Sequence, residues 1–183
     1  MLYAYPMDTT GCGSYRVTHP YAALPDGYKD KVRIIEPGGL GGITAQVSRS
    51  KVLGVDIPSD CDALLVQRPD SEVLAQVLIE AKRQGVKIIL EVDDDLEELD
   101  RRHPAWAELN LAPRAKQAAA RRGISQRDSA LPRLVASTLA DRIVVSTRAL
   151  QAKFSAIAPD VPCVLGPNRI PQASIQAPWT PGG

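Results

Sequence analysis

The sequence predicts an α/β fold with an open, mostly parallel, Rossmann-like sheet and helices on both faces. Residues 86–92 form a run that is apolar on both faces of a strand, as in the interior of a parallel sheet, and three aspartates follow directly. A strand at 62–66 and a helix ending at Gly85 precede this run. Together they predict a right-handed, parallel strand-helix-strand unit. Strands and helices also alternate along the rest of the chain, which indicates the α/β class.

The N-terminal third is expected to contain two strands, one helix and, after them, either a short hairpin or an irregular crossing. The strands are expected at 2–6 and 31–36, and a helix interrupted by a proline is expected at 14–24. Residues 37–42 are rich in glycine, but no Lys-Ser or Lys-Thr pair follows them, so a Walker-type phosphate loop is excluded. Residues 48–60 lack a clear period and are expected to form a short hairpin or an irregular crossing.

The helix between the two central strands has mutually consistent start and stop signals. Asp70 or Ser71 can cap its N-terminus, and its apolar residues recur on one face. Glu72 in the first turn and basic residues in the last turn suit the helix dipole. This helix is therefore expected to pack on the sheet through one face.

After the aspartates, the pattern predicts a short helical turn followed by two more helix and strand pairs. The predicted elements are a turn at 96–99, helices at 131–139 and 150–157, and strands at 143–145 and 161–165. Residues 1–168 are thus expected to form one Rossmann-like domain. Residues 169–183, which are rich in proline and end in two glycines, are expected to be a linker or tail.

The charge balance and the cysteines restrict the class of protein. Lys and Arg number 22 against 21 Asp and Glu, so the net charge of +1 gives no general attraction to nucleic acid or to an anionic membrane. Cys12, Cys61 and Cys163 are odd in number and lack metal-ligand spacing, which favours reduced thiols in a cytoplasmic protein. The chain has no basic leader and no apolar run of ~18 residues, so we expect no membrane span. From the balanced charge we expect no nucleic-acid partner.

Polar groups from distant parts of the chain are expected to meet at the carboxyl edge of the sheet, where open parallel sheets bind ligands. These groups are Gly11, Gly13 and Arg16 after the first strand, Asp93, Asp94 and Asp95 after the central strand, and Ser146, Thr147 and Asn168 after the last two strands. The glycines would let the backbone approach a ligand, and the forked donors of Arg16 could hold a phosphate or a carboxylate. The alternative is an ordinary strand-to-helix turn with a solvated arginine, because a lone GxG is a weak signal.

The three aspartates allow three interpretations. Carboxylate oxygens are ligands for hard cations such as Mg²⁺, but successive residues of a strand point to opposite sides, so at most Asp93 and Asp95 would share a face. One of the three could instead bind polar substrate groups or act as a general base. One could simply cap the following turn. We expect no metal site.

Several short motifs, taken in order, resemble the N-terminal half of bacterial and phage glycosyltransferases of the GT-B fold. The resemblance spans nearly the whole chain and depends on the order and spacing of the motifs. The motifs are Gly11-x-Gly-x-Tyr-Arg16, Val66-Gln-Arg-Pro69, Asp93-Asp-Asp-Leu96, His103-Pro-Ala-Trp106, the segment from Ala140 to Thr147, and Pro167-Asn168-x-Ile170.

The resemblance implies an acceptor-side domain that faces a second, donor-binding domain. It implies a nucleotide-sugar as co-substrate, an acceptor of unknown identity and no bound cofactor or metal. It also adds Arg68 to the candidate substrate-binding residues, and it makes one of Asp93 to Asp95 the candidate catalytic base. The sequence stops near Trp179, about where the donor domain would begin, so a second chain or a longer form is expected to supply that domain.

Two other functions are compatible with the same pattern. The chain could be a non-catalytic binding or assembly module that keeps the sheet without the chemistry. A receiver-like phosphorylation domain is less well supported, because Gly166-Pro-Asn168 occupies the region where such domains place a lysine after a late strand.

Overall fold

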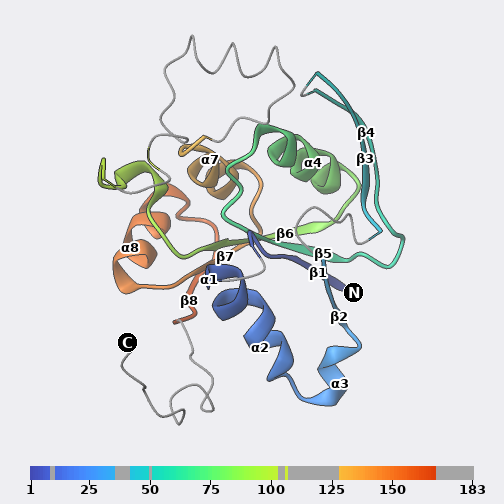
Figure 1. Ribbon diagram of the computed structural model, residues 1–183, viewed down its shortest axis with the longest axis horizontal. Helices are drawn as coiled ribbons and strands as arrows, with labels where there is room; N and C mark the ends of the chain where they lie inside the picture. The colour runs from blue at the N-terminus through green and yellow to red at the C-terminus, as the bar shows by residue number, and fades with distance from the viewer. Residues whose placement is uncertain (9–10, 36–41, 50, 103–105, 107–127, 168–183) are drawn as a thin grey trace, which may run out of the picture.

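Six parallel strands form the central sheet of the computed structural model, which describes residues 1–8, 11–35, 42–49, 51–102, 106 and 128–167 (Figure 1). The strands are β1 (Leu2–Tyr5), β2 (Val32–Ile34), β5 (Ala63–Gln67), β6 (Lys87–Val92), β7 (Arg142–Val145) and β8 (Cys163–Leu165). Their order across the sheet is β2-β1-β5-β6-β7-β8, and every neighbouring pair is parallel. The predicted α/β fold with a mostly parallel, Rossmann-like sheet is therefore confirmed.

Helices cover both faces of this sheet. The helices are α1 (Gly11–Gly13), the π-helix η1 (Ser14–Thr18), α2 (His19–Ala22), α3 (Asp26–Lys29), α4 (Glu72–Arg83), the 3₁₀-helix η2 (Leu96–Glu98), α7 (Leu131–Thr138) and α8 (Arg148–Ile157). Figure 1 shows α4 and α7 above the sheet and α1, α2 and α3 below it. This division follows from right-handed crossovers, because the chain moves one way across the sheet from β5 to β8 and the opposite way from β1 to β2.

The hydrophobic core lies mainly between the sheet and the helices α4, α7 and α8. Val66, Leu90 and Ile143 come from three adjacent strands and are fully buried. Leu78 of α4 and Phe154 of α8 pack in the same cluster. Burying such side chains stabilises a fold by about 1.5–3 kcal/mol each, so the periodic apolar face of α4 fixes the helix on the sheet.

A separate antiparallel hairpin stands at the margin of the molecule beside α4 (Figure 1). It consists of β3 (Thr44–Ser48) and β4 (Lys51–Asp56). Of the two forms predicted for 48–60, the hairpin is the one observed, although it begins and ends several residues earlier. It is an insertion between β2 and β5 and takes no part in the central sheet.

The helices differ from the prediction in four respects. Helical backbone begins at Gly11 inside the predicted turn, and a π-helix occupies Ser14–Thr18. The short α3 (Asp26–Lys29) was missed. Ser71 occupies the N-cap position of α4, as one of the two predicted caps, but its side chain makes no capping hydrogen bond.

Several predicted features lie wholly or mostly outside the described residues. These are the glycine-rich segment 37–42, the loop 103–106 apart from Trp106, and the tail 169–183. Among the helices that the structure describes, none is long and apolar enough to cross a membrane.

Candidate functional site

The carboxyl ends of β1, β5 and β6 lie next to each other in the middle of the sheet. The chain leaves β1 towards β2 on one side, whereas β5 lies on the other side, so the strand order reverses between β1 and β5. Such a reversal opens a crevice at the carboxyl edge of a parallel sheet, and ligands bind there in many α/β proteins. The candidate residues from the N-terminal helices and from the β5 and β6 ends gather at this edge.

A buried ion pair joins the first helical segment to the central strand. Nε and Nη2 of Arg16 in η1 each lie 2.5 Å from Oε1 of Glu91 in β6. Arg16 also donates a hydrogen bond to the backbone carbonyl of Gly166, which follows β8. The side chains of Arg16 and Glu91 are only 4% and 2% exposed, so solvent screens their attraction weakly.

Burial is the main influence on the Glu91 carboxyl group. Loss of hydration raises the pKa of Glu91 to about 7, although Arg16 opposes that shift. Gln67 is the register partner of Glu91 on β5, and its Oε1 accepts a hydrogen bond from the backbone N–H of Met7. Glu91 Oε2 and Gln67 Nε2 are buried and have no hydrogen-bond partner among the described residues. Burying these polar atoms thus costs free energy, and the positive charge of Arg16 offsets the negative charge of Glu91.

A second ion cluster lies beside the first and is closer to solvent. Arg68 follows β5 with a φ of 42°, in the left-handed region that non-glycine residues rarely adopt. Its Nη1 donates to Asp94 Oδ2 at 2.7 Å, and its Nε lies 3.2 Å from Asp93 Oδ1. The contact with Asp93 is an ion pair without hydrogen-bond geometry, because the same Oδ1 has no hydrogen-bond donor. Asp93 is buried, whereas the Asp94 side chain is 48% exposed.

The third aspartate points elsewhere. Asp95 Oδ2 lies 2.6 Å from Lys153 Nζ on α8, and Lys153 also approaches Glu97 and Glu98. The prediction that only Asp93 and Asp95 could share a face is therefore wrong, because Asp93 and Asp94 share Arg68 instead. The physical reason is that β6 ends at Val92, so strand alternation no longer applies to the aspartates. Asp95 occupies the N-cap position of η2 but makes no capping hydrogen bond through its side chain.

The polar residues after β7 have structural partners. Ser146 Oγ donates to the backbone carbonyl of Asp93 at 2.7 Å and so ties the end of β7 to the aspartate turn. Thr147 Oγ1 accepts from the backbone N–H of Leu150 and caps α8. The predicted site residue Asn168 lies outside the described residues. Ligand contacts by Ser146 and Thr147 stay predictions, although both residues belong to the edge where they were expected.

Glycine is favoured at both positions of the first turn, but for different structural reasons. A Cβ on Gly13 would lie 1.9 Å from the backbone carbonyl oxygen of Asp8, so no larger residue fits there. Gly13 N–H also donates to Asp8 Oδ1 at 3.1 Å. Gly11 has a φ of 40° with open space around it, which favours glycine through backbone conformation. Both glycines thus shape the start of the helical run that includes Arg16.

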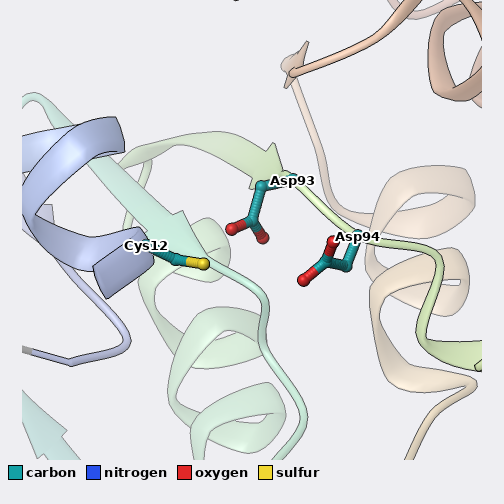
Figure 2. A group of neighbouring side chains, drawn as sticks. All are labelled: Cys12, Asp93 and Asp94. Carbon is teal, nitrogen blue, oxygen red and sulfur yellow. The ribbon is translucent and has the colours of Figure 1, made fainter. Parts of the chain in front are cut away.

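One group of side chains has the composition of a metal site. Cys12 Sγ and carboxylate oxygens of Asp93 and Asp94 lie within 4.8 Å of one another, and Figure 2 shows the three side chains pointing towards a common space. Arg68 already supplies positive charge to both carboxylates. Burial, followed by a hydrogen bond to Asp93, raises the pKa of the Cys12 thiol to about 12, which disfavours the thiolate that a metal needs. The cluster fits an internal ion pair better than a bound cation.

A shallow depression opens beside the aspartate turn, on the side facing α7 and α8. Its lining combines apolar side chains with acidic and basic groups. The lining residues are Asp94, Asp95, Leu96, Glu97, Ser129, Pro132, Arg133, Lys153 and Phe154. Asp94 belongs both to this depression and to the Arg68 cluster, so it connects the sheet edge with the surface.

Three residues of this region were missed by the sequence analysis. Glu91 was counted as part of an apolar strand, although a carboxylate inside a buried strand indicates that a cationic partner lies nearby, as Arg16 does. Gln67 gave the same kind of signal within a buried strand. Lys153 gave none, because its contact with Asp95 depends on how α8 packs.

No family model, curated protein or solved structure matches this chain.

Proposed function

We propose that this chain is the acceptor-side domain of a GT-B-like glycosyltransferase, which transfers a sugar from a nucleotide-sugar to a hydroxyl-bearing acceptor. The observation that carries the proposal is the Arg68, Asp93 and Asp94 cluster at the carboxyl edge, where the strand order reverses. The motifs that resemble those enzymes contribute residues to this same edge. We also propose a cytoplasmic location, which suits the free thiols of the chain.

The three members of the cluster differ in what they can do chemically. Asp93 is buried against Arg68, so it holds the guanidinium in place. Asp94 binds the same guanidinium while half of its side chain faces solvent, which leaves acceptor capacity for sugar hydroxyls. In the proposed reaction Asp94 takes the proton of the attacking hydroxyl as that oxygen bonds to the anomeric carbon. The nucleotide diphosphate leaves with the electron pair of the broken bond.

The role of Arg16 in this proposal differs from the one expected from sequence. Its guanidinium already binds Glu91 and Gly166 and is almost fully buried. Arg16 therefore serves as a positioning residue, which holds the helical run 11–22 against the edge. Contact between Arg16 and a phosphate or carboxylate of a ligand stays a prediction.

Ligand binding by the isolated chain tests the acceptor side of the proposal. The experiment follows amide chemical shifts while a panel of mono- and oligosaccharides is added to the protein. We expect one class of saccharide to shift residues near the aspartate turn, and Asp94→Asn to weaken its binding by about tenfold, or ~1.4 kcal/mol. The matched control is Asp26→Asn on α3, whose fully exposed side chain pairs only with Lys29 among the described residues. Equal affinities for both variants would contradict the proposal.

The requirement for a donor domain has a separate test. The isolated chain is incubated with nucleotide-sugars and the acceptor found above, and release of the nucleotide is measured. We expect no turnover until a second α/β polypeptide, or a longer form of the chain, is added. Turnover by the isolated chain would show that the donor side lies within it.

A non-catalytic binding or assembly module is the second candidate, and one observation favours it. The basic residues of the edge already have acidic partners within the chain: Arg16 binds Glu91, Arg68 binds Asp93 and Asp94, and Lys153 binds Asp95. This function predicts that Asp94→Asn leaves biological activity intact. A core variant such as Leu78→Ala would still abolish activity, because it costs about 2–5 kcal/mol of stability.

A further inference from the structure

The β3–β4 hairpin has one satisfied edge and one open edge. On the β4 side, Gln76 Oε1 accepts from the backbone N–H of Val52 at 2.8 Å, and Gln84 Nε2 donates to the backbone carbonyl of Val55 at 3.1 Å. Both glutamines belong to α4, so this helix closes the outer edge of β4. The opposite edge of the hairpin is formed by β3.

The ladder pattern identifies which groups of β3 are open. In an antiparallel pair the backbone N–H and C=O of one residue point to the same side of its strand. Two directly opposed residues point these groups either both towards each other or both away from each other. Val52 and Val55 turn their backbone groups away from β3 towards α4, and their register partners are Val47 and Ala45. The backbone groups of Ala45 and Val47 therefore point away from β4, and they have no hydrogen-bond partner in the described part of the chain.

Within the residues that the structure describes, this edge lacks the features that usually prevent strand pairing. Residues 44–48 include no charged residue and no proline. The irregularity of the hairpin lies on β4, where Leu53 has no partner, so β3 itself keeps a regular register. The Val47 side chain is 48% exposed. An unprotected, regular edge of this kind is a template for another extended strand.

We propose that β3 pairs with β3 of a second copy of this chain, antiparallel and about a two-fold axis at Gln46. In that register Ala45 of each copy faces Val47 of the other, so all the open N–H and C=O groups of both residues are used at once. Gln46 faces Gln46 of the second copy as a non-hydrogen-bonded pair, which agrees with its own backbone groups pointing to β4.

Charge complementarity favours a second copy as the occupant. Arg49 lies in the hairpin turn directly after β3, and Asp56 pairs with Thr44 at the other end of the hairpin. Antiparallel pairing brings the basic turn of each copy to the acidic end of the other. Arg49 and Asp56 of the second copy are then two strand spacings apart, about 10 Å between Cα atoms, which an arginine side chain can span.

Cysteine cross-linking tests the register directly. The two-fold axis puts Gln46 and its copy about 4.5 Å apart between Cα atoms, which suits a disulfide. Gln46→Cys should therefore form a covalent dimer under mild oxidation. The matched control is Thr44→Cys on the same strand, because Thr44 faces Ser48 of the second copy and not itself; both positions are exposed. We expect the Gln46→Cys dimer to form about tenfold faster than the Thr44→Cys dimer, with the unmodified protein giving the background of its own three cysteines.

A proline variant tests the same edge without a covalent trap. Val47→Pro removes an outward N–H that the hairpin does not use, so the fold should persist while pairing between copies is lost. A single strand pair makes a small interface, so the dimer is expected to be transient and is measured by sedimentation over a range of concentrations. We expect Val47→Pro to abolish both the dimer and the cross-link of a Gln46→Cys background.

The remaining outcomes overturn the proposal. They are equal cross-linking rates for the two cysteine variants, a dimer that survives Val47→Pro, and a chain that stays monomeric with no Gln46→Cys cross-link. If Val47→Pro fails to fold, amide exchange of the unmodified protein decides. Ala45 and Val47 amides should exchange about tenfold more slowly at high protein concentration than at low concentration, and no change would exclude a second copy at this edge.

Discussion

The two ion clusters at the carboxyl edge are neighbours but differ in their access to water. Arg16 and Glu91 are almost completely buried and join η1 to β6. Arg68 binds one buried and one half-exposed carboxylate, Asp93 and Asp94. The same pairing of guanidinium and carboxylate therefore occurs in two environments within one small region.

The difference shows which charges serve the fold and which can serve a ligand. A buried pair cannot exchange its partner without exposing a charge to a weakly polar interior, and loss of one member costs several kcal/mol. A half-exposed pair can release one partner to water or to a hydroxyl group at little cost. We therefore assign positioning to the Arg16 cluster and binding to the Arg68 cluster, and the variants below test that division.

Arg16→Met should have the largest effect on stability. It leaves the Glu91 carboxylate buried without its cation, so the free energy of unfolding at pH 8 should fall by about 3–5 kcal/mol. Urea denaturation followed by circular dichroism measures the change. Arg83→Met is the control, since Arg83 is an exposed arginine with an i,i+3 partner, and should change stability by less than about 0.5 kcal/mol. Similarly small losses of stability for both variants would contradict a structural role of the buried Arg16–Glu91 pair.

The second largest effect should be the change in stability with pH that is caused by Glu91. Its pKa is raised by burial to about 7 from an ordinary value near 4.5, so the folded protein holds this proton more tightly than the unfolded chain. The stabilisation is complete below pH ~4.5 and is lost as the pH rises through ~7, which amounts to about 3 kcal/mol. Glu91→Gln should remove this component, so its stability should change less between pH 5 and pH 8, while loss of the anion beside the buried Arg16 lowers its stability at pH 8. Unfolding free energies of the two proteins between pH 5 and pH 8 are compared, and parallel curves would contradict the prediction.

Lys153→Met should have a smaller effect. Lys153 binds Asp95 and approaches Glu97 and Glu98, and both it and Asp95 are partly exposed. Loss of these contacts should lower the free energy of unfolding by about 1 kcal/mol at low salt. The difference should shrink in 1 M NaCl, because salt screens partly exposed charges. An effect independent of salt would mean that packing of the lysine stem, and not its charge, is responsible.

Asp94→Asn should have the smallest effect on the fold. Half of the side chain faces solvent and Arg68 keeps Asp93, so stability should change by less than about 1 kcal/mol. The thermal midpoint measures this change, and it should be read together with the roughly tenfold loss of saccharide affinity expected above. A large loss of stability would place Asp94 with the structural cluster.

The sequence was sufficient for the strands of the sheet because each one had a local signal. The run that ends before Asp93, the caps of α4 and the alternation of strands and helices all predict parallel packing, and all six strands occur within a few residues of the expected positions. The π-helix at Ser14–Thr18 and the short α3 had no comparable signal, and Arg16 of the π-helix has its partners Glu91 and Gly166 far away in the chain. Tertiary packing overrode the local pattern there.

The candidate site was predictable as a place but not as a set of contacts. The carboxyl edge follows from the strand order, and Arg16, Arg68 and Asp93 to Asp95 do come together around it. Their partners could not be read from spacing, because Arg16 with Glu91 and Asp95 with Lys153 are far apart in the chain. The direction of each aspartate was also hidden, since it depends on where β6 ends.

The hydrogen bond from Arg16 to Gly166 spans 150 positions of the chain. During synthesis the N-terminal helices emerge long before the carbonyl that this arginine needs, so the edge cannot close until nearly the whole domain has left the ribosome. The first turn is made early and completed late: Glu91 can pair with Arg16 before Gly166 is synthesised, and the contact with Gly166 is added last.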